Sequence, residues 1–118
     1  MTTIKKKIGD WGEDNAARFL INRGYQVIEK NYHSRYGEID LICLKDDDLV
    51  FVEVKTRRAG GMGRGEDAVD ARKKRKIRLT IDCYLASYPS RHYPRFDVIV
   101  IELDGVKQMI NHYQAVEI

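Results

Sequence analysis

The segment 37–55 constrains the fold of this chain more than any other segment does. It holds two apolar runs of strand length on either side of the polar tetrad 45–48. A short, turn-forming segment between two such runs predicts a β-hairpin. With the turn centred on Asp46 and Asp47, the numbers of opposing residues sum to 93, which fixes the register of the whole hairpin.

Four charged side chains meet at one end of a hairpin in this register. Asp40 is expected opposite Glu53, and Glu38 is expected opposite Lys55. Opposed carboxylates about 5 Å apart repel each other by ~3 kcal/mol at an effective dielectric of about 20, and cross-strand pairs of like charge are normally avoided. The sequence therefore predicts that a cation lies between the carboxylates.

The second strand of this hairpin is apolar on both of its faces. One face carries Val50, Val52 and Val54, and the other carries Leu49, Phe51, Glu53 and Lys55. Such a strand is typical of a sheet interior, where charges are costly unless they are paired or bound to a metal. The alternative is a surface hairpin in which Glu38 bonds to Lys55, and Asp40 to an arginine, as ordinary salt bridges.

The composition is that of a soluble globular protein. Hydrophobic residues make up 43% and charged residues 33% of the 118 residues, a length that predicts one domain over residues 1–118. No apolar run approaches a membrane span, and no apolar stretch follows the basic N-terminal residues as in a signal peptide. Cys43 and Cys83 have no paired spacing, so we expect reduced core cysteines in a cytoplasmic protein.

The net charge of +3 is unevenly distributed. Residues 55–78 hold ten Lys or Arg against three Asp or Glu, a net charge of +7, whereas the rest of the chain carries −4. This basic segment begins where the acidic cluster ends, which suits a polyanion whose phosphates meet a metal held by carboxylates. A solvated helix face would account for the same charges without a ligand.

Apolar residues at helical spacing predict a first helix over residues 5–23. Glu13 falls on the apolar stripe of this helix and would add a carboxylate to the acidic cluster. Alternatively, Asp10 and Glu13 form a capping box in a helix that starts at Trp11. The sequence leaves both interpretations open.

The remaining patterns predict an α/β fold. Residues 25–32 indicate a first strand, which the polar residues 31–35 join to the hairpin, and residues 66–88 indicate a second helix. Residues 95–101 and 106–113 indicate two further strands. The order α-β-β-β-α-β-β fits a single-layer mixed β-sheet flanked by helices.

Basic residues beyond the hairpin are candidate contacts to nucleic acid. The glycine-rich loop 56–65 contains Arg57, Arg58 and Arg64 and is expected to be a mobile loop that closes over a phosphate backbone. Lys73 falls on the apolar stripe of the second helix and should point inward, unless its ammonium snorkels to the helix edge. Lys74 should face solvent or nucleic acid.

Two further residues have more than one interpretation. His33 is either a general base or, as we favour, a loop histidine that contacts phosphate, because no Ser, Cys or second His is placed to form a nucleophilic set with it. Asp97 is either another metal ligand or, as we favour, a salt-bridge partner of Arg95.

The combination of Asp40 with Glu53, Val54 and Lys55, between a first helix and a basic second helix, resembles the core of the PD-(D/E)xK restriction-endonuclease-like nucleases. The blocks of this sequence also look like the YraN-type family of small bacterial proteins, over nearly the whole chain. Those blocks are Gly12 with Glu13, residues 37–42, residues 52–57, Lys73 and residues 95–98. The resemblance implies a restriction-endonuclease-like, metal-dependent nuclease fold akin to Holliday-junction resolvases.

On this basis we expect the chain to hydrolyse phosphodiester bonds in DNA. Asp40, Glu53 and the backbone carbonyl of Val54 would hold Mg²⁺ or Mn²⁺ through hard oxygen ligands, which activates a water and neutralises charge on the phosphoryl oxygens. Lys55 would orient that water or stabilise the transition state. Glu13 would complete the outer ligand set.

Two rival hypotheses belong to other functional classes. A nucleic-acid-binding module with the nuclease fold and little catalysis predicts binding that weakens steeply with salt. A partner-binding protein with a purely structural acidic cluster predicts indifference to every nucleic acid. Cleavage of both strands of branched DNA would favour a homodimer, and single-stranded DNA is the other candidate substrate.

Overall fold

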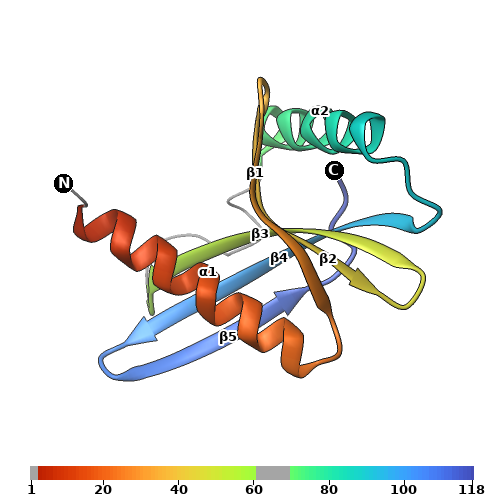
Figure 1. The fold of residues 1–118 in the computed structure, drawn as a ribbon. Helices are drawn as coiled ribbons and strands as arrows, with labels where there is room; N and C mark the ends of the chain where they lie inside the picture. Colours follow the sequence, from red (N-terminus) through yellow and green to blue (C-terminus); the bar gives the residue numbers. More distant parts are fainter. Residues whose placement is uncertain (1–2, 61–69) are drawn as a thin grey trace.

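The computed structural model describes residues 3–60 and 70–118. Within them the chain forms two helices and five strands in the predicted order, α-β-β-β-α-β-β. The strands make one sheet in sequence order, antiparallel except for the parallel pair β3–β4 (Figure 1). The α/β fold class with a single mixed sheet is therefore confirmed. The elements are α1 (Ile4–Asn22), β1 (Gln26–Ser34), β2 (Gly37–Lys45), β3 (Asp48–Arg58), α2 (Ala71–Ser87), β4 (Tyr93–Asp104) and β5 (Lys107–Tyr113).

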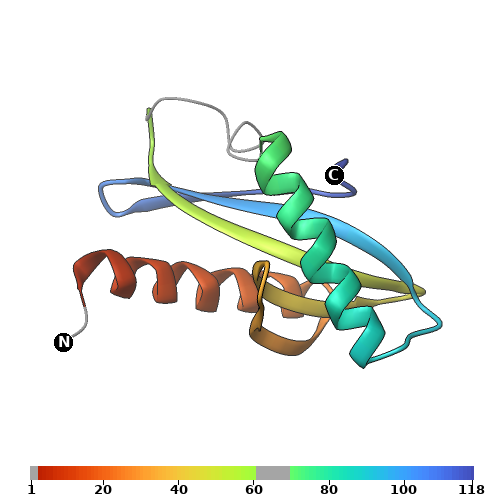
Figure 2. The same cartoon turned by 90° about the horizontal axis from the view of Figure 1, so that it is seen from above.

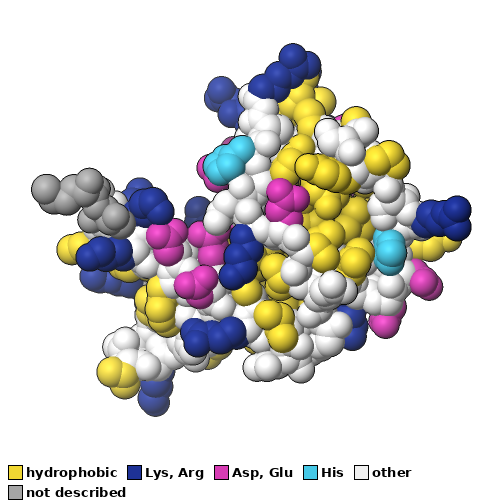
Figure 3. Space-filling view, in the orientation of Figure 1, with side chains coloured by type: hydrophobic (Ala, Val, Ile, Leu, Met, Phe, Trp, Pro, Cys, Tyr) yellow, Lys and Arg dark blue, Asp and Glu magenta, His cyan; other side chains and the backbone are white. Residues whose placement is uncertain are grey.

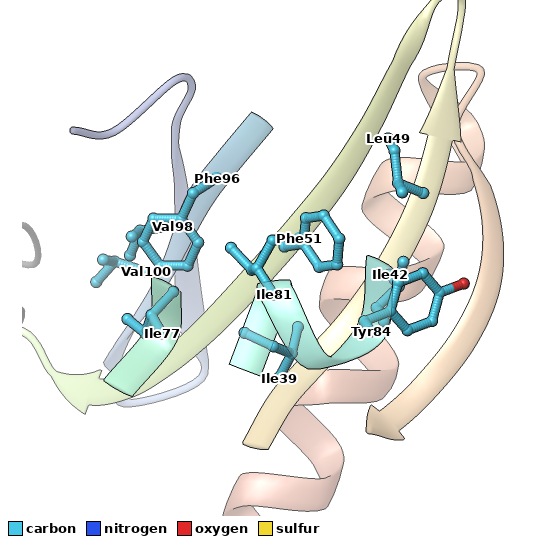
Figure 4. Close-up of a cluster of buried hydrophobic side chains, with 10 residues drawn as sticks. All are labelled: Ile39, Ile42, Leu49, Phe51, Ile77, Ile81, Tyr84, Phe96, Val98 and Val100. Carbon is cyan, nitrogen blue, oxygen red and sulfur yellow. The ribbon is translucent and has the colours of Figure 1, made fainter. Parts of the chain in front are cut away.

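The two helices cover opposite faces of the sheet (Figure 2). On the α1 side, Val50 and Val52 of β3 pack in one buried cluster with residues of α1. On the α2 side, Leu49 and Phe51 pack with Ile77 and other residues of α2 (Figure 4). The prediction that this strand is apolar on both faces and interior to the sheet is confirmed. Among the described residues, no helix has both the length and the apolar character needed to cross a bilayer.

Helix α1 begins earlier than a capping box at Asp10 would require. Thr3 is the N-cap, and its side-chain oxygen accepts a hydrogen bond of 3.1 Å from the N–H of Lys6. Asp10 therefore lies well inside the helix, and the capping-box interpretation of Asp10 and Glu13 is wrong. The helix ends before Gly24, whose φ of 87° a glycine adopts without strain.

The β2–β3 hairpin has the predicted turn, and the predicted register holds for the part of the hairpin next to that turn. Asp46 and Asp47 form a two-residue turn between Lys45 and Asp48, and Asp46 has the left-handed φ of 51° that aspartate tolerates. Opposing residue numbers sum to 93 from Lys45–Asp48 as far as Leu41–Val52.

Several boundaries differ from the sequence-based expectation, and those of β1 and α2 bear on the site. Strand β1 continues through Ser34, so residues 31–34 are not a connection. They belong to the strand, and Tyr32, His33 and Ser34 pair with β2. Helix α2 begins at Ala71, after the N-cap Asp70, whose carboxylate accepts a hydrogen bond of 2.8 Å from the N–H of Lys73. An aspartate whose side chain bonds to the backbone in this way is favoured at the N-cap of a helix and not in its interior, so the helix starts after Asp70. The expected helical residues 66–69 lie outside the described residues.

Candidate active site

The acidic side chains gather where β2 parts from β3. The β2–β3 ladder ends at Leu41–Val52, whereas β2 stays paired with β1 down to Gly37. Asp40 is the next residue beyond the ladder, and its Oδ2 accepts a hydrogen bond of 2.7 Å from the N–H of Val54. The carboxylate thus takes the place of the strand partner that Val54 lacks on this side.

The carbonyl of Val54 faces the same gap between the strands. In a β-strand, the N–H and C=O of one residue point toward the same neighbouring strand. Because the N–H of Val54 bonds to Asp40, its carbonyl oxygen points to the same side of β3. This is the direction that the predicted metal-ligand role requires.

Burial and neighbouring charges act against an ionised Asp40. Burial is the largest influence, Glu53 the second, and together with Glu13 and Glu38 they raise the pKa of Asp40 from 3.8 to about 8, although the hydrogen bond from Val54 opposes the shift. Such an environment favours a bound proton or a cation at this carboxylate.

Lys73 supplies a positive charge beside the second carboxylate. Its Nζ lies 2.9 Å from Oε1 of Glu53, and the side chain of Glu53 is only 16% exposed. Lys73 therefore points inward from the first turn of α2, as predicted. The sequence led us to expect a cation at this site, and the ammonium of Lys73 lies beside Glu53.

Helix α1 contributes Glu13 to the site, because the helix lies very close to β3 at Gly12, the residue before Glu13. A Cβ atom at Gly12 would collide with Oγ1 of Thr56, so a glycine is needed for this approach. Oε1 of Glu13 is buried and has no hydrogen-bond partner among the residues that the structure describes. Burial, followed by the charge of Asp10, raises the pKa of Glu13, and a hydrogen bond with Asp40 opposes this shift.

Glu38 does not lie opposite Lys55. Its Oε2 is 3.6 Å from Nδ1 of His33, across the β1–β2 pair. The predicted cross-strand pairs Asp40–Glu53 and Glu38–Lys55 are both wrong as strand pairs, because the β2–β3 ladder ends at Leu41–Val52. His33 belongs to strand β1 and not to a loop. Lys55 is exposed and lines a hollow together with Asp40 and other acidic residues.

The predicted nucleic-acid contacts are distributed around this site. Arg57 forms an ion pair of 2.8 Å with Glu102, so part of its charge is balanced within the protein. Arg58 is exposed at the end of β3, and Lys74 is half-buried in the first turn of α2. Arg64 lies outside the described residues. The contacts of these side chains with DNA stay predictions.

Two hollows meet at the carboxylates. The first hollow, of about 690 Å³, lies between α1, the β1–β2 hairpin and α2. The second hollow, of about 500 Å³, lies between α1 and the ends of β3 and β4. Glu13, Asp40 and Glu53 line both hollows. Figure 3 shows acidic side chains gathered on one part of the surface, with Lys and Arg side chains around them.

Several residues of the first hollow were missed by sequence reasoning. They come from β1, the β1–β2 turn and α2, which meet only in the folded chain. Thr80 is one of them, buried with its Oγ1 3.1 Å from Oγ of Ser34. No spacing in the sequence connects these segments, so no signal marked them. These residues are Asn31, Tyr36, Lys76 and Thr80.

Asp97 is a salt-bridge partner, as favoured from the sequence. It is fully buried, and Arg95 contacts both of its oxygens at 2.9 and 2.8 Å. Nε2 of His112 lies 2.7 Å from Oδ2, and the N–H of Ala115 donates to Oδ1 at 3.0 Å. Burial tends to raise the pKa of Asp97, but the hydrogen bonds from His112, Arg95 and Ala115 outweigh it and hold this pKa below its usual value.

The raised pKa of Asp40 predicts that the metal-free protein loses stability as the pH rises. Up to about pH 8 the folded protein keeps a proton that the unfolded chain releases near 3.8. Because the folded state binds more protons in this window, the free energy of unfolding falls as the pH increases across it.

Asp40→Asn keeps an acceptor for the N–H of Val54 without the charge. In EDTA near the upper end of the window, this variant should be more stable than wild type by at least about 1 kcal/mol.

Thermal unfolding followed by circular dichroism, from about pH 5 to about pH 9, checks this expectation. The wild-type melting temperature should fall more steeply with pH than that of Asp40→Asn. Asp104→Asn, which removes an exposed carboxylate at the β4–β5 turn, should follow wild type. Parallel curves for wild type and Asp40→Asn would contradict the raised pKa.

Comparison with known proteins places the chain in a family. The model of the uncharacterised protein family UPF0102 matches residues 12–101. A UPF0102 protein of Syntrophomonas wolfei is 46% identical over 111 residues, which cover 92% of this chain and 96% of the relative. A UPF0102 protein of Caldanaerobacter subterraneus is 43% identical over 112 residues, with 92% of each chain covered.

A solved structure is also similar. It is the crystal structure of a repair endonuclease from Pyrococcus abyssi, with a TM-score of 0.47 and 17% sequence identity over 89% of this chain and 41% of that chain. The family match and the two close relatives confirm the resemblance to the YraN-type family. The chain therefore belongs to the uncharacterised protein family UPF0102.

Proposed function

We propose that this protein is a metal-dependent nuclease that hydrolyses phosphodiester bonds in DNA. One observation carries the proposal: Asp40, Glu53 and Glu13 converge from two strands and a helix at the junction of two hollows. Three carboxylates in one largely buried place are unfavourable without a compensating cation. Many enzymes that process phosphates supply that cation as a divalent metal.

The residues present fit Mg²⁺ or Mn²⁺. Among the described residues, no three His, Cys, Asp or Glu side chains form a ready metal-binding group, and Glu53 is paired with Lys73. The candidate metal ligands of the site are nevertheless hard oxygen atoms, the kind that these metals prefer. Oε1 of Glu13 is buried, has no hydrogen-bond partner among residues 3–60 and 70–118, and is therefore a candidate ligand atom. Lys73 supplies the positive charge beside Glu53, and its ion pair with Glu53 would break if Glu53 bound a metal.

In this proposal Asp40, Glu53 and the carbonyl of Val54 hold the metal, and Glu13 completes the set. The metal, when bound, supplies a Lewis acid that neutralises phosphoryl charge and makes water easier to deprotonate. The water oxygen bonds to phosphorus, the ester P–O bond breaks, and the water proton ends on the leaving oxygen.

Two lysines act on the substrate in this proposal. Lys55 is on the same strand as Glu53, two residues further on, and therefore on the same face. It orients the attacking water or donates to the phosphoryl oxygens as charge develops there. Lys73, once freed from Glu53, pairs with a phosphate. Lys74, Arg57, Arg58 and Arg64 provide further positive charge for the DNA backbone.

A second candidate is a nucleic-acid-binding module with the nuclease fold and little or no catalysis. The ion pair between Lys73 and Glu53 favours it, because a permanent lysine would satisfy the carboxylate without a metal. In that case the protein would bind DNA in a salt-dependent manner and give no products with either metal.

The deciding experiment is a cleavage assay on single-stranded, duplex and branched DNA with Mg²⁺, Mn²⁺ or EDTA. The nuclease proposal expects products that require the metal and that disappear when Asp40 or Glu53 is replaced. Binding without products in either metal would reject it in favour of the binding module. The preference for branched or single-stranded DNA and the homodimer stay predictions.

A further inference from the structure

An apolar shelf lies beside the acidic site on the N-terminal part of α1. It is a shallow hollow of about 270 Å³ formed by Ile4, Ile8 and Trp11 of α1 with Leu103 of β4, and Lys7 lines its side. The three α1 residues follow helical spacing and therefore share one face. They are 77%, 43% and 39% exposed, respectively. Large apolar side chains exposed together in this way mark a binding surface more often than an ordinary exterior.

The shelf is continuous with the site that holds the carboxylates. Ile8 and Leu103 line both the shelf and the second hollow. At its other end, the second hollow reaches Asp40 and Glu53. A chain molecule that crosses the acidic site and follows the second hollow therefore arrives at Trp11.

Basic side chains border this path. Lys5, Lys55 and Arg58 line the second hollow, and Lys7 lines the shelf. The path thus offers positive charge along its sides and an apolar, aromatic surface at its end. Surfaces that bind single-stranded nucleic acid combine these two features, because cations follow the backbone while flat side chains stack on the bases.

We propose that the shelf receives an unpaired nucleobase, so that the protein binds an unpaired DNA strand across its acidic site. This inference rests on the proposed function, which it narrows to one class of substrate. In a duplex both faces of every internal base are covered by neighbouring bases, so the shelf has nothing to stack on. An unpaired strand presents the bare face of a base to Trp11 and its apolar neighbours.

A lipid surface is the other class of partner that a basic helix with an exposed tryptophan can fit. The shelf, however, is bounded by Leu103 of β4 and leads into the second hollow. A planar bilayer would contact the shelf but not the second hollow behind it. A nucleic-acid strand would contact the shelf and the second hollow together. The geometry therefore favours nucleic acid.

The chain's single tryptophan is a built-in probe of the shelf. In EDTA, where no metal-dependent cleavage takes place, an oligo(dT) strand should quench the fluorescence of Trp11 and saturate. A blunt duplex of equal length should bind more weakly and quench little. With a fluorescein-labelled oligo(dT) and anisotropy as the readout, Trp11→Ala should weaken binding about tenfold, and Trp11→Phe should keep most of the affinity.

Tyr93→Ala is the matched control, because Tyr93 is an aromatic residue that is 70% exposed at the start of β4 and lines neither hollow nor shelf. It should bind oligo(dT) as wild type does. Equal affinities of Trp11→Ala and Tyr93→Ala would overturn the inference. So would equal binding of duplex and single strand, or a blue shift of the Trp11 emission with anionic phosphatidylserine vesicles and no quenching by oligo(dT).

The outcomes separate this inference from the proposed nuclease. Quenching in EDTA together with an absence of products in Mg²⁺ and Mn²⁺ would support the shelf and reject the nuclease. Metal-dependent cleavage of an unpaired strand that Trp11→Ala performs with an unchanged KM would support the nuclease and reject the shelf.

Discussion

Asp40→Asn and Glu53→Gln are each expected to lower the rate of metal-dependent DNA cleavage by about 10²- to 10³-fold or more. Both replacements keep the size of the side chain and remove the negative charge that attracts a divalent cation. Asn at position 40 also keeps an acceptor for the N–H of Val54, which bonds to Asp40 at 2.7 Å. The loss should therefore come from the site and not from unfolding.

Asp10→Asn is the matched control for these variants. Asp10 lines the first hollow as Asp40 does, but it is more than half exposed and forms its ion pair with Lys6 at 3.0 Å. Its replacement should leave the cleavage rate close to that of wild type. Initial rates on the preferred DNA, with thermal unfolding as a check of the fold, measure the effect. Undiminished cleavage by both Asp40→Asn and Glu53→Gln would reject their assignment as metal ligands.

The largest loss of stability is expected from Asp97→Ala. This carboxylate is fully buried and is the common partner of Arg95 and His112. Removing one member of a buried ion pair leaves the other without compensation and typically costs about 3–5 kcal/mol. Because a domain of this size is stable by only about 5–15 kcal/mol, the variant should unfold at a much lower denaturant concentration.

Urea unfolding of Asp97→Ala, Asp97→Asn and Asp48→Asn tests this expectation. Asp48 also pairs with Arg95, at 2.9 Å, but its side chain is 35% exposed, so its loss should cost less than about 1 kcal/mol. Asp97→Asn keeps hydrogen-bond capacity and should lie between the two. A stable Asp97→Ala protein that had lost cleavage would contradict the structural role and would indicate a metal ligand instead.

The sequence predicted the parts of the site that depend on local periodicity. A two-residue turn at Asp46 and Asp47 sets the β2–β3 register, and alternation in β3 assigns its residues to two faces. Helical spacing alone brought Glu13 to the inner side of α1 and Lys73 to the inner side of α2. These rules hold because each uses contacts within one element or between adjacent strands.

The sequence could not predict where the sheet divides. Ile39 and Leu41 are two residues apart and would share a face in a regular strand, yet Ile39 packs on the α2 side and Leu41 on the α1 side. Strand β2 therefore changes its orientation at Asp40. This change moves Glu38 away from Lys55 and toward His33. The alternation of apolar residues in β2 does not reveal this change, because it assigns Ile39 and Leu41 to the same face.

The claim that Asp40 and Glu53 share a divalent cation is tested most directly by calorimetric titration of Mn²⁺ and Mg²⁺ into wild type and Asp40→Ala near pH 7. We expect saturable binding to wild type, with a heat that depends on the buffer because the metal displaces the proton held by Asp40. Asp40→Ala should show no such binding. Identical titration curves for the two proteins, or no binding to wild type with either metal, would contradict this account of the site.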